Sequence, residues 1–377
     1  MNMIEVRPIR TRREREVFLT FPWHIYRDDP LWVPPLLSEK RKTIDPERGA
    51  FFKNGYAELY IAWKEGRPAG TIAAAEDTAA SKFKGYGECM IGFFECIEDY
   101  AVAEALLSAA EEWAHRHGLI SMYGPYNLDV EDSRGLLIEG YDRPPALLCG
   151  HNPPYYPEFF ERFGLRKWNE DGLAYAIDIN LESPEIQRMM KLADRIRRRK
   201  EIKVRGADFK QVEREIDIIL DLSNRSLAHL PGFTTYTRES IDAVIRPLVS
   251  VADPELALFA EVDGKPAGFF PGVPNLNEVL IHLNGLRHPW DYARLLRYMR
   301  YRPKAISVKS VLVPPEYWDT GVGVLLFDEL ARRAAAKGYT WADLSITGED
   351  NTDTWPLAHH MGAQIYKRYR NYKKQIA

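Results

Sequence analysis

The pattern of apolar and polar residues is most informative between residues 306 and 338, where it changes from a strand to a helix. Residues 306–313 carry β-branched side chains at near-alternate positions and end at Pro314-Pro315, which predicts a buried strand. A loop containing Gly321 and Gly323 follows. From residue 324 to residue 337 apolar side chains recur at helical spacing, and Gly338 is suited to end the helix. The stretch therefore predicts a strand, a glycine-containing loop and an amphipathic helix.

Short sequence elements recur 198 positions apart, which indicates a duplicated unit. Residues 4–7 (IEVR) resemble residues 202–205 (IKVR), and residues 66–70 (GRPAG) resemble residues 264–268 (GKPAG). Gly164 corresponds in the same register to Gly362. Because this period is too long for a solenoid repeat, the three matches favour two copies of one α/β unit.

Each copy is expected to contain a strand, a helical region, a hairpin, a central strand and a helix. We therefore predict domains at residues 1–180 and 202–377. Residues 181–201 are predicted to form an amphipathic linker helix that carries a basic cluster. The first copy also has an insertion, which we interpret as an extra hairpin because turn residues separate two apolar runs, 136–138 and 146–149.

The glycine loop predicts an anion site. Gly321 and Gly323 allow backbone conformations and close approaches that side chains would prevent. The first turn of the following helix offers unpaired N–H groups and the positive end of the helix dipole. A phosphate or pyrophosphate is the natural ligand of such a turn. Since G-x-G before a helix is a weak signal alone, a plain tight turn is the alternative.

The residues after the loop complete a longer order of elements. A second strand is expected over residues 339–346, Asn351 opens a short helix that ends at Gly362, and residues 363–374 follow as a final hairpin. This order resembles the coenzyme A core of the GNAT acyltransferases. The stretches GPYN, GLLIEGYD and HNPPYY extend the resemblance, to bacterial proteins of the tandem-GNAT kind, over nearly the whole chain. It implies an α/β (α+β) fold of two tandem GNAT-like domains, each a mixed, mostly antiparallel sheet flanked by helices.

Acyl transfer from acetyl-CoA or another acyl-CoA to a primary amine is the activity that this resemblance implies. The amine would attack the thioester directly, without a covalent enzyme intermediate. The backbone of Val311, Leu312 and Val313 would pair with the pantetheine arm, and Asn351 would bond the arm or orient the next helix. The pyrophosphate would be held by the loop and helix start, namely Trp318, Asp319, Thr320, Gly321, Val322, Gly323 and Val324.

Two departures from the family pattern leave the proton-transfer residue open. The Arg or Gln that usually begins the loop is Trp318 here, and the usual Tyr position holds Ala358. His359 and Glu278 are our candidates for the catalytic groups, and His360 and His282 are the alternatives. The same departures keep a second hypothesis open, in which the fold is a non-catalytic module that binds CoA or another ligand.

The first copy is not expected to bind the cofactor. Its central strand leads into the next helix without G-x-G, and Glu98 and Asp99 stand at the helix start, where they would repel a pyrophosphate. The insertion instead brings polar and aromatic residues together. They form either an acceptor-binding rim or rigidly packed loops: Tyr126, Asn127, Glu131, Asp132, His151, Asn152, Tyr155 and Tyr156.

Composition narrows the classes of partner. A net charge of −3 gives no argument for binding nucleic acid or a membrane surface. Cys89, Cys96 and Cys149 are expected to be buried thiols, which suits a reducing cytoplasm. No apolar run approaches the roughly 20 residues of a membrane span. Since neither H-x-x-x-H nor C-x-x-C occurs, we expect no metal.

The expected acceptor is a small-molecule or peptide amine, and the space between the two domains is one candidate location for it. A monomer and a homodimer both remain open.

Overall fold

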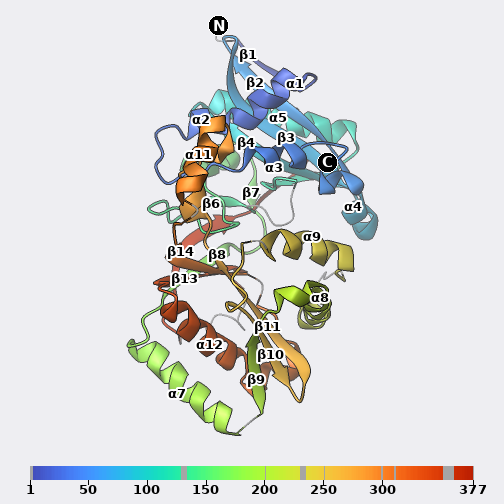
Figure 1. Ribbon diagram of the computed structural model, residues 1–377. Coiled ribbons are helices and arrows are strands. Elements are labelled where there is room, and N and C mark those ends of the chain that lie inside the picture. The colour runs from blue at the N-terminus through green and yellow to red at the C-terminus, as the bar shows by residue number, and fades with distance from the viewer. Residues whose placement is uncertain are drawn as a thin grey trace.

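The computed structural model shows two α/β halves, one above the other in Figure 1. The structure describes residues 3–128, 134–199, 201–229, 235–249, 251–298, 300–309, 311–350 and 361–376. Among the helices in these ranges, none combines the length and the apolar content that crossing a bilayer requires.

The first half is built on a seven-stranded sheet with the order β1-β2-β3-β4-β5-β15-β7. Neighbouring strands are antiparallel except β4 and β5, which run parallel. β2 and β3 form the hairpin that the sequence predicts. The strands are β1 (Ile4–Pro8), β2 (Gly55–Lys64), β3 (Arg67–Asp77), β4 (Cys89–Cys96), β5 (Ser121–Gly124), β7 (Arg166–Lys167) and β15 (Tyr372–Gln375).

Helices cover both faces of this sheet. α5 (Tyr100–Arg116) buries apolar residues at helical spacing on one face, among them Leu106 and Trp113. On the opposite face Phe18 and Leu37, from α1 and α3, pack against Ile61 of β2. The remaining helical elements are α1 (Arg12–Thr20), α2 (Pro22–Ile25), α3 (Leu37–Thr43), η1 (Ala50–Lys53), α4 (Thr78–Lys84) and α6 (Tyr156–Arg162).

The second half is built on an eight-stranded sheet with the order β6-β14-β8-β13-β12-β11-β10-β9. Only β12 and β13 pair in parallel, over three residues each, and they diverge beyond Ser307 and Asp343. The strands are β6 (Leu136–Glu139), β8 (Gly172–Asp178), β9 (Ile202–Gly206), β10 (Ala257–Val262), β11 (Lys265–Pro274), β12 (Ala305–Val308), β13 (Trp341–Gly348) and β14 (Gln364–Arg370).

Two layers of helices enclose the second sheet. α12 (Val322–Ala336) packs on one face through Leu326 and Leu330, and α8 (Val212–Leu227) packs on the other through Ile219. The linker helix α7 (Pro184–Arg199) lies on the outside of α12 (Figure 1). The other elements are η2 (Phe209–Gln211), α9 (Arg238–Val249), α10 (Asn277–Leu280), η3 (Asn284–Leu286), α11 (Pro289–Tyr298) and η4 (Pro315–Thr320).

The insertion of the first copy does not form the predicted hairpin. Its first apolar run is the strand β6, but β6 pairs with the far strand β14. The second run, residues 146–149, forms a turn in which Cys149 N–H donates to Ala146 O at 3.0 Å and Leu148 has a φ of 61°. Pro144-Pro145 precede this run and lack the N–H groups that a paired strand would need. The run is therefore a turn that buries Ala146 and Cys149 instead of a strand.

Each half gives its last strand to the other sheet. β8, from the first copy, lies between β13 and β14, and β15, from the second copy, lies between β5 and β7. Figure 1 accordingly shows the C-terminus in the upper half. The two crossings between the sheets run side by side, because Trp168 N–H donates to Asn371 O at 2.8 Å. Since both exchanged strands are interior strands, neither sheet is continuous without the other half.

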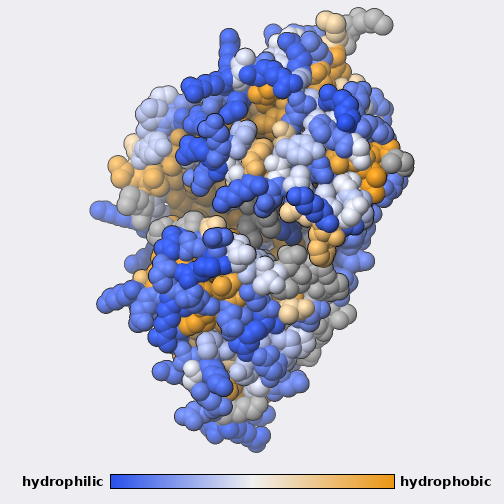
Figure 2. Space-filling model, turned by 90° about the vertical axis from the view of Figure 1, so that its right-hand side faces the viewer, coloured by the Kyte–Doolittle hydropathy of each residue, from blue (hydrophilic) through white to orange (hydrophobic). Residues whose placement is uncertain are grey.

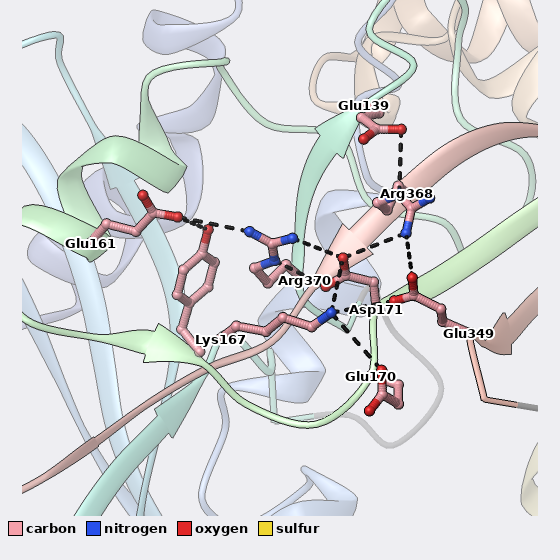
Figure 3. Close-up of polar contacts among 9 residues, drawn as sticks. Glu139, Glu161, Lys167, Glu170, Asp171, Glu349, Arg368 and Arg370 are labelled. Carbon is pink, nitrogen blue, oxygen red and sulfur yellow. Dashed lines mark hydrogen bonds and ion pairs between the residues drawn. The ribbon is translucent and has the colours of Figure 1, made fainter.

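A charged cluster closes the seam where the two crossings meet (Figure 3). Asp171 is 2% exposed and accepts hydrogen bonds from the Arg370 guanidinium at 2.9 and 2.8 Å. Lys167 and Arg368 lie 3.4 and 3.6 Å from the same carboxylate. Burial alone would raise the pKa of Asp171, but these cations outweigh it and hold that pKa below its ordinary value. The ion pair joins the residue before β8 to the last residue of β14.

We expect Asp171→Asn to lower the free energy of unfolding by about 2–3 kcal/mol, because Arg370 would lose its buried partner. Asp171 has a lowered pKa in the folded state, so its contribution is present above the unfolded pKa of about 4 and is lost as pH falls through the folded value. Urea unfolding at pH 7 and pH 3 measures both effects. As a control, Glu5→Gln breaks the exposed pair with Arg7 and should cost under about 1 kcal/mol. Equal losses in the two variants would contradict a special role for the seam.

Candidate functional site

The glycine loop leaves the N-terminus of α12 without a side-chain cap. Gly321 has a φ of 91°, which side-chain-bearing residues rarely adopt, and α12 begins at Val322 with no acidic residue in its first turn. A Cβ added to Gly323 would meet no atom of the described residues within 4 Å. The predicted residues Asp319 and Thr320 end η4 just before this turn. An open helix N-terminus of this kind fits a diphosphate group.

Gly321 differs from Gly323 because the linker helix covers it. A Cβ added to Gly321 would lie 2.7 Å from Ile196 Cδ1 of α7. The contact is held by Arg197, whose guanidinium lies 2.6 Å from the buried carboxylate of Asp328 on α12. α7 therefore packs on one side of the loop and leaves the side of Gly323 open.

The segment before the loop has one paired edge and one edge that faces away from β11. Leu312 exchanges backbone hydrogen bonds with Phe269 at 3.0 and 2.8 Å, so the polar backbone groups of Val311 and Val313 point to the other edge. Trp318 donates its Nε1–H to Val313 O at 2.8 Å. The indole thus engages one of the backbone groups that we predicted would pair with the pantetheine arm.

The structure describes only one of the two predicted catalytic residues, Glu278. His359 lies outside the residues that the structure describes, as does the predicted arm-binding residue Asn351. The Glu278 carboxylate accepts from the backbone N–H groups of Lys304 and Ala305 at 2.9 and 2.8 Å, and from a tyrosine hydroxyl. These contacts brace the start of β12. A catalytic role for either residue stays a prediction.

In the first half, the chain itself fills the place that corresponds to the cofactor slot. β4 and β5 pair only at Cys89 and Met90. Beyond these residues, Tyr126 N–H donates to Ile91 O at 2.8 Å, and Phe93 N–H donates to Asn127 Oδ1 at 2.7 Å. The edge of β4 is therefore already paired where a pantetheine arm would add.

The helix that follows β4 is capped by its own acid. Asp99 accepts from Ala101 N–H at 3.0 Å at the start of α5, and Lys64 binds the same carboxylate at 2.5 Å. Asp99 thus occupies the helix start, as the sequence predicted, so the α5 N-terminus is capped by an acid whereas that of α12 is not.

A cavity of about 290 Å³ lies beside β4 of the first half. Its size is close to the lower end for small-molecule sites. The first half and its insertion supply most of the lining, and α10 of the second half adds Asn277 and Leu280. Figure 2 shows the molecule hollowed where the two halves meet, with apolar residues around the hollow. The apolar lining includes Phe18, Leu19, Trp32, Phe93, Leu136 and Leu147.

Comparisons with known proteins agree with this architecture. The model of the Acetyltransferase (GNAT) family matches residues 223–363. Protein YghO of Escherichia coli (strain K12) is 30% identical to this chain, over 98% of the chain and 95% of its own length. This chain belongs to the GNAT acyltransferase family. Acyl transfer, with an acyl-CoA as the family's usual co-substrate, is the chemistry that membership supports.

Further relatives of this GNAT protein cover its full length. The bacterial ceramide synthase of Caulobacter vibrioides is 29% identical over 99% of this chain and 98% of its own length. A tandem GNAT protein from the clavulanic acid biosynthesis pathway has a TM-score of 0.56 at 13% identity, covering 100% of this chain and 99% of its own. A GCN5-related N-acetyltransferase from Sphaerobacter thermophilus has a TM-score of 0.55 at 14% identity, with 99% and 96% covered. The structural matches confirm the predicted tandem GNAT fold.

Glu95 of β4 is the carboxyl group that lines the cavity of this GNAT protein. Tyr156 OH donates to Glu95 Oε2 at 2.8 Å, and Tyr26 also hydrogen-bonds to this carboxylate. Burial raises the pKa of Glu95 to about 7, although both tyrosine hydrogen bonds act to lower it. Glu95 was not among the site residues predicted from the sequence. Its signal is a single acid within the apolar strand GFFEC.

His151, from the predicted rim, also lines the cavity. Its Nε2 lies 2.6 Å from Asp29 Oδ2, and its side chain is 5% exposed. Its Nδ1 has no hydrogen-bond partner in the part of the chain that the structure describes. Burial lowers the pKa of His151, and the bond and charge of Asp29 oppose that shift. Asp29, 122 positions away in sequence, had no local signal and was missed.

Some of the other residues predicted for the acceptor-binding rim line the cavity. Asn127, Asn152 and Tyr156 line the cavity, and Asn152 also holds β6 by accepting from Leu137 N–H at 2.7 Å. Glu131 and Asp132 lie outside the described residues.

One residue in the cavity lining, Cys149 of the insertion, also contacts the second half next to its diverging strands. Cys149 lines the cavity, and its Sγ lies 4.0 Å from Lys309 Nζ, just after β12. Lys309 in turn binds the buried carboxylate of Asp343 at 2.8 Å. Asn277 fixes the same loop by donating to Pro145 O at 3.0 Å. One wall of the cavity therefore stands against the strand that leads to the glycine loop.

We expect Glu95→Gln to be more stable than the wild type at high pH. The folded-state pKa of Glu95, about 7, lies above the unfolded value of about 4.3, so the wild type loses stability as pH rises between these values. The neutral Gln avoids this loss, which we place at about 2 kcal/mol at pH 8 and near zero at pH 4, allowing for water in the cavity. Denaturant unfolding at the two pH values measures the difference. A variant that is less stable than wild type at pH 8 would contradict the shift.

Proposed function

We propose that this protein is an acyl-CoA-dependent N-acyltransferase whose second half holds the CoA moiety. The proposal rests on a difference between two corresponding helix N-termini, that of α12 in the second half and that of α5 in the first half. The N-terminus of α12 is uncapped and open at Gly323, whereas the N-terminus of α5 is capped by Asp99. At α12 the N–H of Val322 lies 3.4 Å from Thr320 Oγ1, and the helix start is otherwise without a side-chain cap among the described residues. Its backbone amides and positive dipole suit a diphosphate better than the acid-capped start of α5 does.

The neighbouring strands support the same assignment of roles. The edge of the second half at Val311 faces away from β11, and Val311 is 41% exposed. The corresponding edge of the first half is paired with the chain around Tyr126. A pantetheine arm therefore has an edge to bind in the second half, where its thioester would approach Lys309 and the cavity wall at Cys149.

We propose that the acceptor is a primary amine on an apolar chain. One relative over the full length is named a ceramide synthase, and a ceramide is an N-acylated long-chain amino alcohol. The mostly apolar lining of the cavity suits the chain of such an amine, and its few polar groups suit the head. Direct attack of the amine on the thioester needs the reactants held together, and positioning of this kind contributes roughly 7–11 kcal/mol.

Gly323→Glu tests the assignment of the cofactor site. The Cβ of the new side chain would have no atom of the described residues within 4 Å, and an acid is favourable at this helix position, so folding should be retained. We expect acetyl-CoA binding, measured by calorimetry, to weaken at least about tenfold, which requires a loss of about 1.4 kcal/mol. Gly321→Glu is unsuitable, since its side chain would collide with Ile196.

Ala101→Glu is the matched control, because Ala101 is the exposed second residue of α5 as Gly323 is the second residue of α12. Its affinity for acetyl-CoA should equal that of the wild type. Loss of binding in Ala101→Glu with normal binding in Gly323→Glu would place the cofactor in the first half and overturn the proposal.

A second candidate function is a module that binds CoA without turnover. One contact favours it: the Trp318 indole donates to Val313 O, a group that the pantetheine arm would otherwise use. Thiol release from acetyl-CoA and palmitoyl-CoA with a panel of amines separates the candidates. Binding without thiol release on any amine would support the module.

A further inference from the structure

We propose that the cavity beside β4 is the acceptor site, and that His151 is the base that takes a proton from the bound amine. The inference rests on the proposed function, because it places the acceptor of that reaction. It assigns the acceptor to the first half of the chain, while the cofactor belongs to the second. The ligand class is a primary amine with an apolar chain.

His151 has a buried ring nitrogen without a hydrogen-bond partner among the described residues. A buried polar atom without a partner is destabilising, so such atoms usually have a ligand or a role. The Nε2 of His151 faces the Asp29 carboxylate at 2.6 Å, and an ionised carboxylate only accepts. Nε2 must therefore carry the proton. Nδ1 is left as a lone-pair acceptor without a protein partner among the described residues, and it belongs to a residue that lines the cavity.

His151 is paired with the carboxylate of Asp29. A carboxylate bound to one ring nitrogen fixes the tautomer of a histidine and stabilises the imidazolium that forms when the other nitrogen takes a proton. Here burial favours the neutral ring before the reaction, and Asp29 compensates the charge afterwards. This combination is what a general base for an ammonium needs.

The lining of the cavity combines a few polar groups with many apolar side chains. Glu95, held by Tyr156 and Tyr26, is a second polar group in the same lining as His151. A carboxyl group of this kind can accept a hydrogen bond from an ammonium or a hydroxyl. The apolar side chains of Phe18 and Leu280 add a lining with no hydrogen-bonding capacity, which suits the hydrocarbon chain of the amine.

The acceptor amine, the thioester and His151 account for every proton and electron pair in the reaction. The ammonium of the acceptor gives one proton to His151 Nδ1, and the freed lone pair attacks the thioester carbonyl carbon. The C–N bond forms, the C–S bond breaks, and the electron pair leaves on sulfur. A second amine proton neutralises the thiolate to the thiol. The proton on His151 passes to solvent when the amide leaves.

The charged surroundings of His151 define its pH behaviour. The titratable groups that act on it or share its cavity are Asp29, Lys367, Glu95, Lys40, Tyr26, Tyr156 and Cys149. Burial holds the pKa of His151 below its ordinary value of about 6.5. We expect kcat to rise with pH through that lowered value, since only the neutral ring accepts a proton.

His151→Gln tests the proposal. The Gln amide can still donate to Asp29 but cannot take a proton, so we expect kcat with n-octylamine or sphinganine to fall about 10²–10⁴-fold. The rising limb of the pH profile should disappear, and acetyl-CoA affinity by calorimetry should be unchanged. His115→Gln, on an exposed position of α5, is the control and should keep wild-type kcat. Asp29→Asn, which removes the positioning carboxylate, should lower kcat and shift the same limb.

The outcomes separate the two proposals. A wild type that binds no acyl-CoA would overturn the proposed function. A wild type that acylates n-octylamine, with His151→Gln matching it in kcat and pH profile, would overturn only the acceptor site. Equal turnover of n-octylamine and of free lysine, whose side chain ends in charge, would contradict the apolar acceptor class.

Discussion

The exchange of interior strands between the two sheets is the constraint on which the rest of the molecule depends. β8 completes the sheet of the second half, and β15 completes that of the first. The two crossings lie side by side and are tied by the buried pair of Asp171 and Arg370. Because each core needs a strand from the other copy, the relative position of the two halves is fixed by folding. A cavity that takes its lining from both can then keep a defined shape.

Duplication followed by divergence explains why one such molecule holds two different kinds of site. The same strand–helix junction has no side-chain cap among the described residues at α12, where we propose the anion site, and is a self-capped turn at Asp99. At the same gap between diverging strands, the described residues of the second half place Trp318 on Val313 O, whereas in the first half the chain around Tyr126 pairs with β4. The first copy therefore keeps the fold, and its insertion contributes residues to the cavity instead of to a cofactor site. That insertion carries His151 to the cavity and Cys149 to the neighbourhood of Lys309.

The sequence was informative where structure is set by local patterns. Apolar spacing predicted α12 to within a few residues, the expected hairpin is formed by β2 and β3, and the 198-residue repeat predicted two copies of one α/β unit. The exchange of β8 and β15 was not predictable, because an apolar strand carries no signal for which of two similar sheets it joins. The hairpin in the insertion was wrong for two reasons: β6 pairs with the distant strand β14, and the second apolar run forms a turn after Pro144-Pro145. Asp29 meets His151 only through the tertiary fold, so no spacing rule could find it.

We propose above all that the second half binds the cofactor and that its thioester faces the cavity of the first half. A crystal structure with the unreactive thioether analogue of acetyl-CoA tests this most directly. We expect the diphosphate at the N-terminus of α12 beside Gly323, with the thioether sulfur at the cavity wall near Cys149. A diphosphate at the N-terminus of α5, or a thioether that points away from the cavity, would contradict the account.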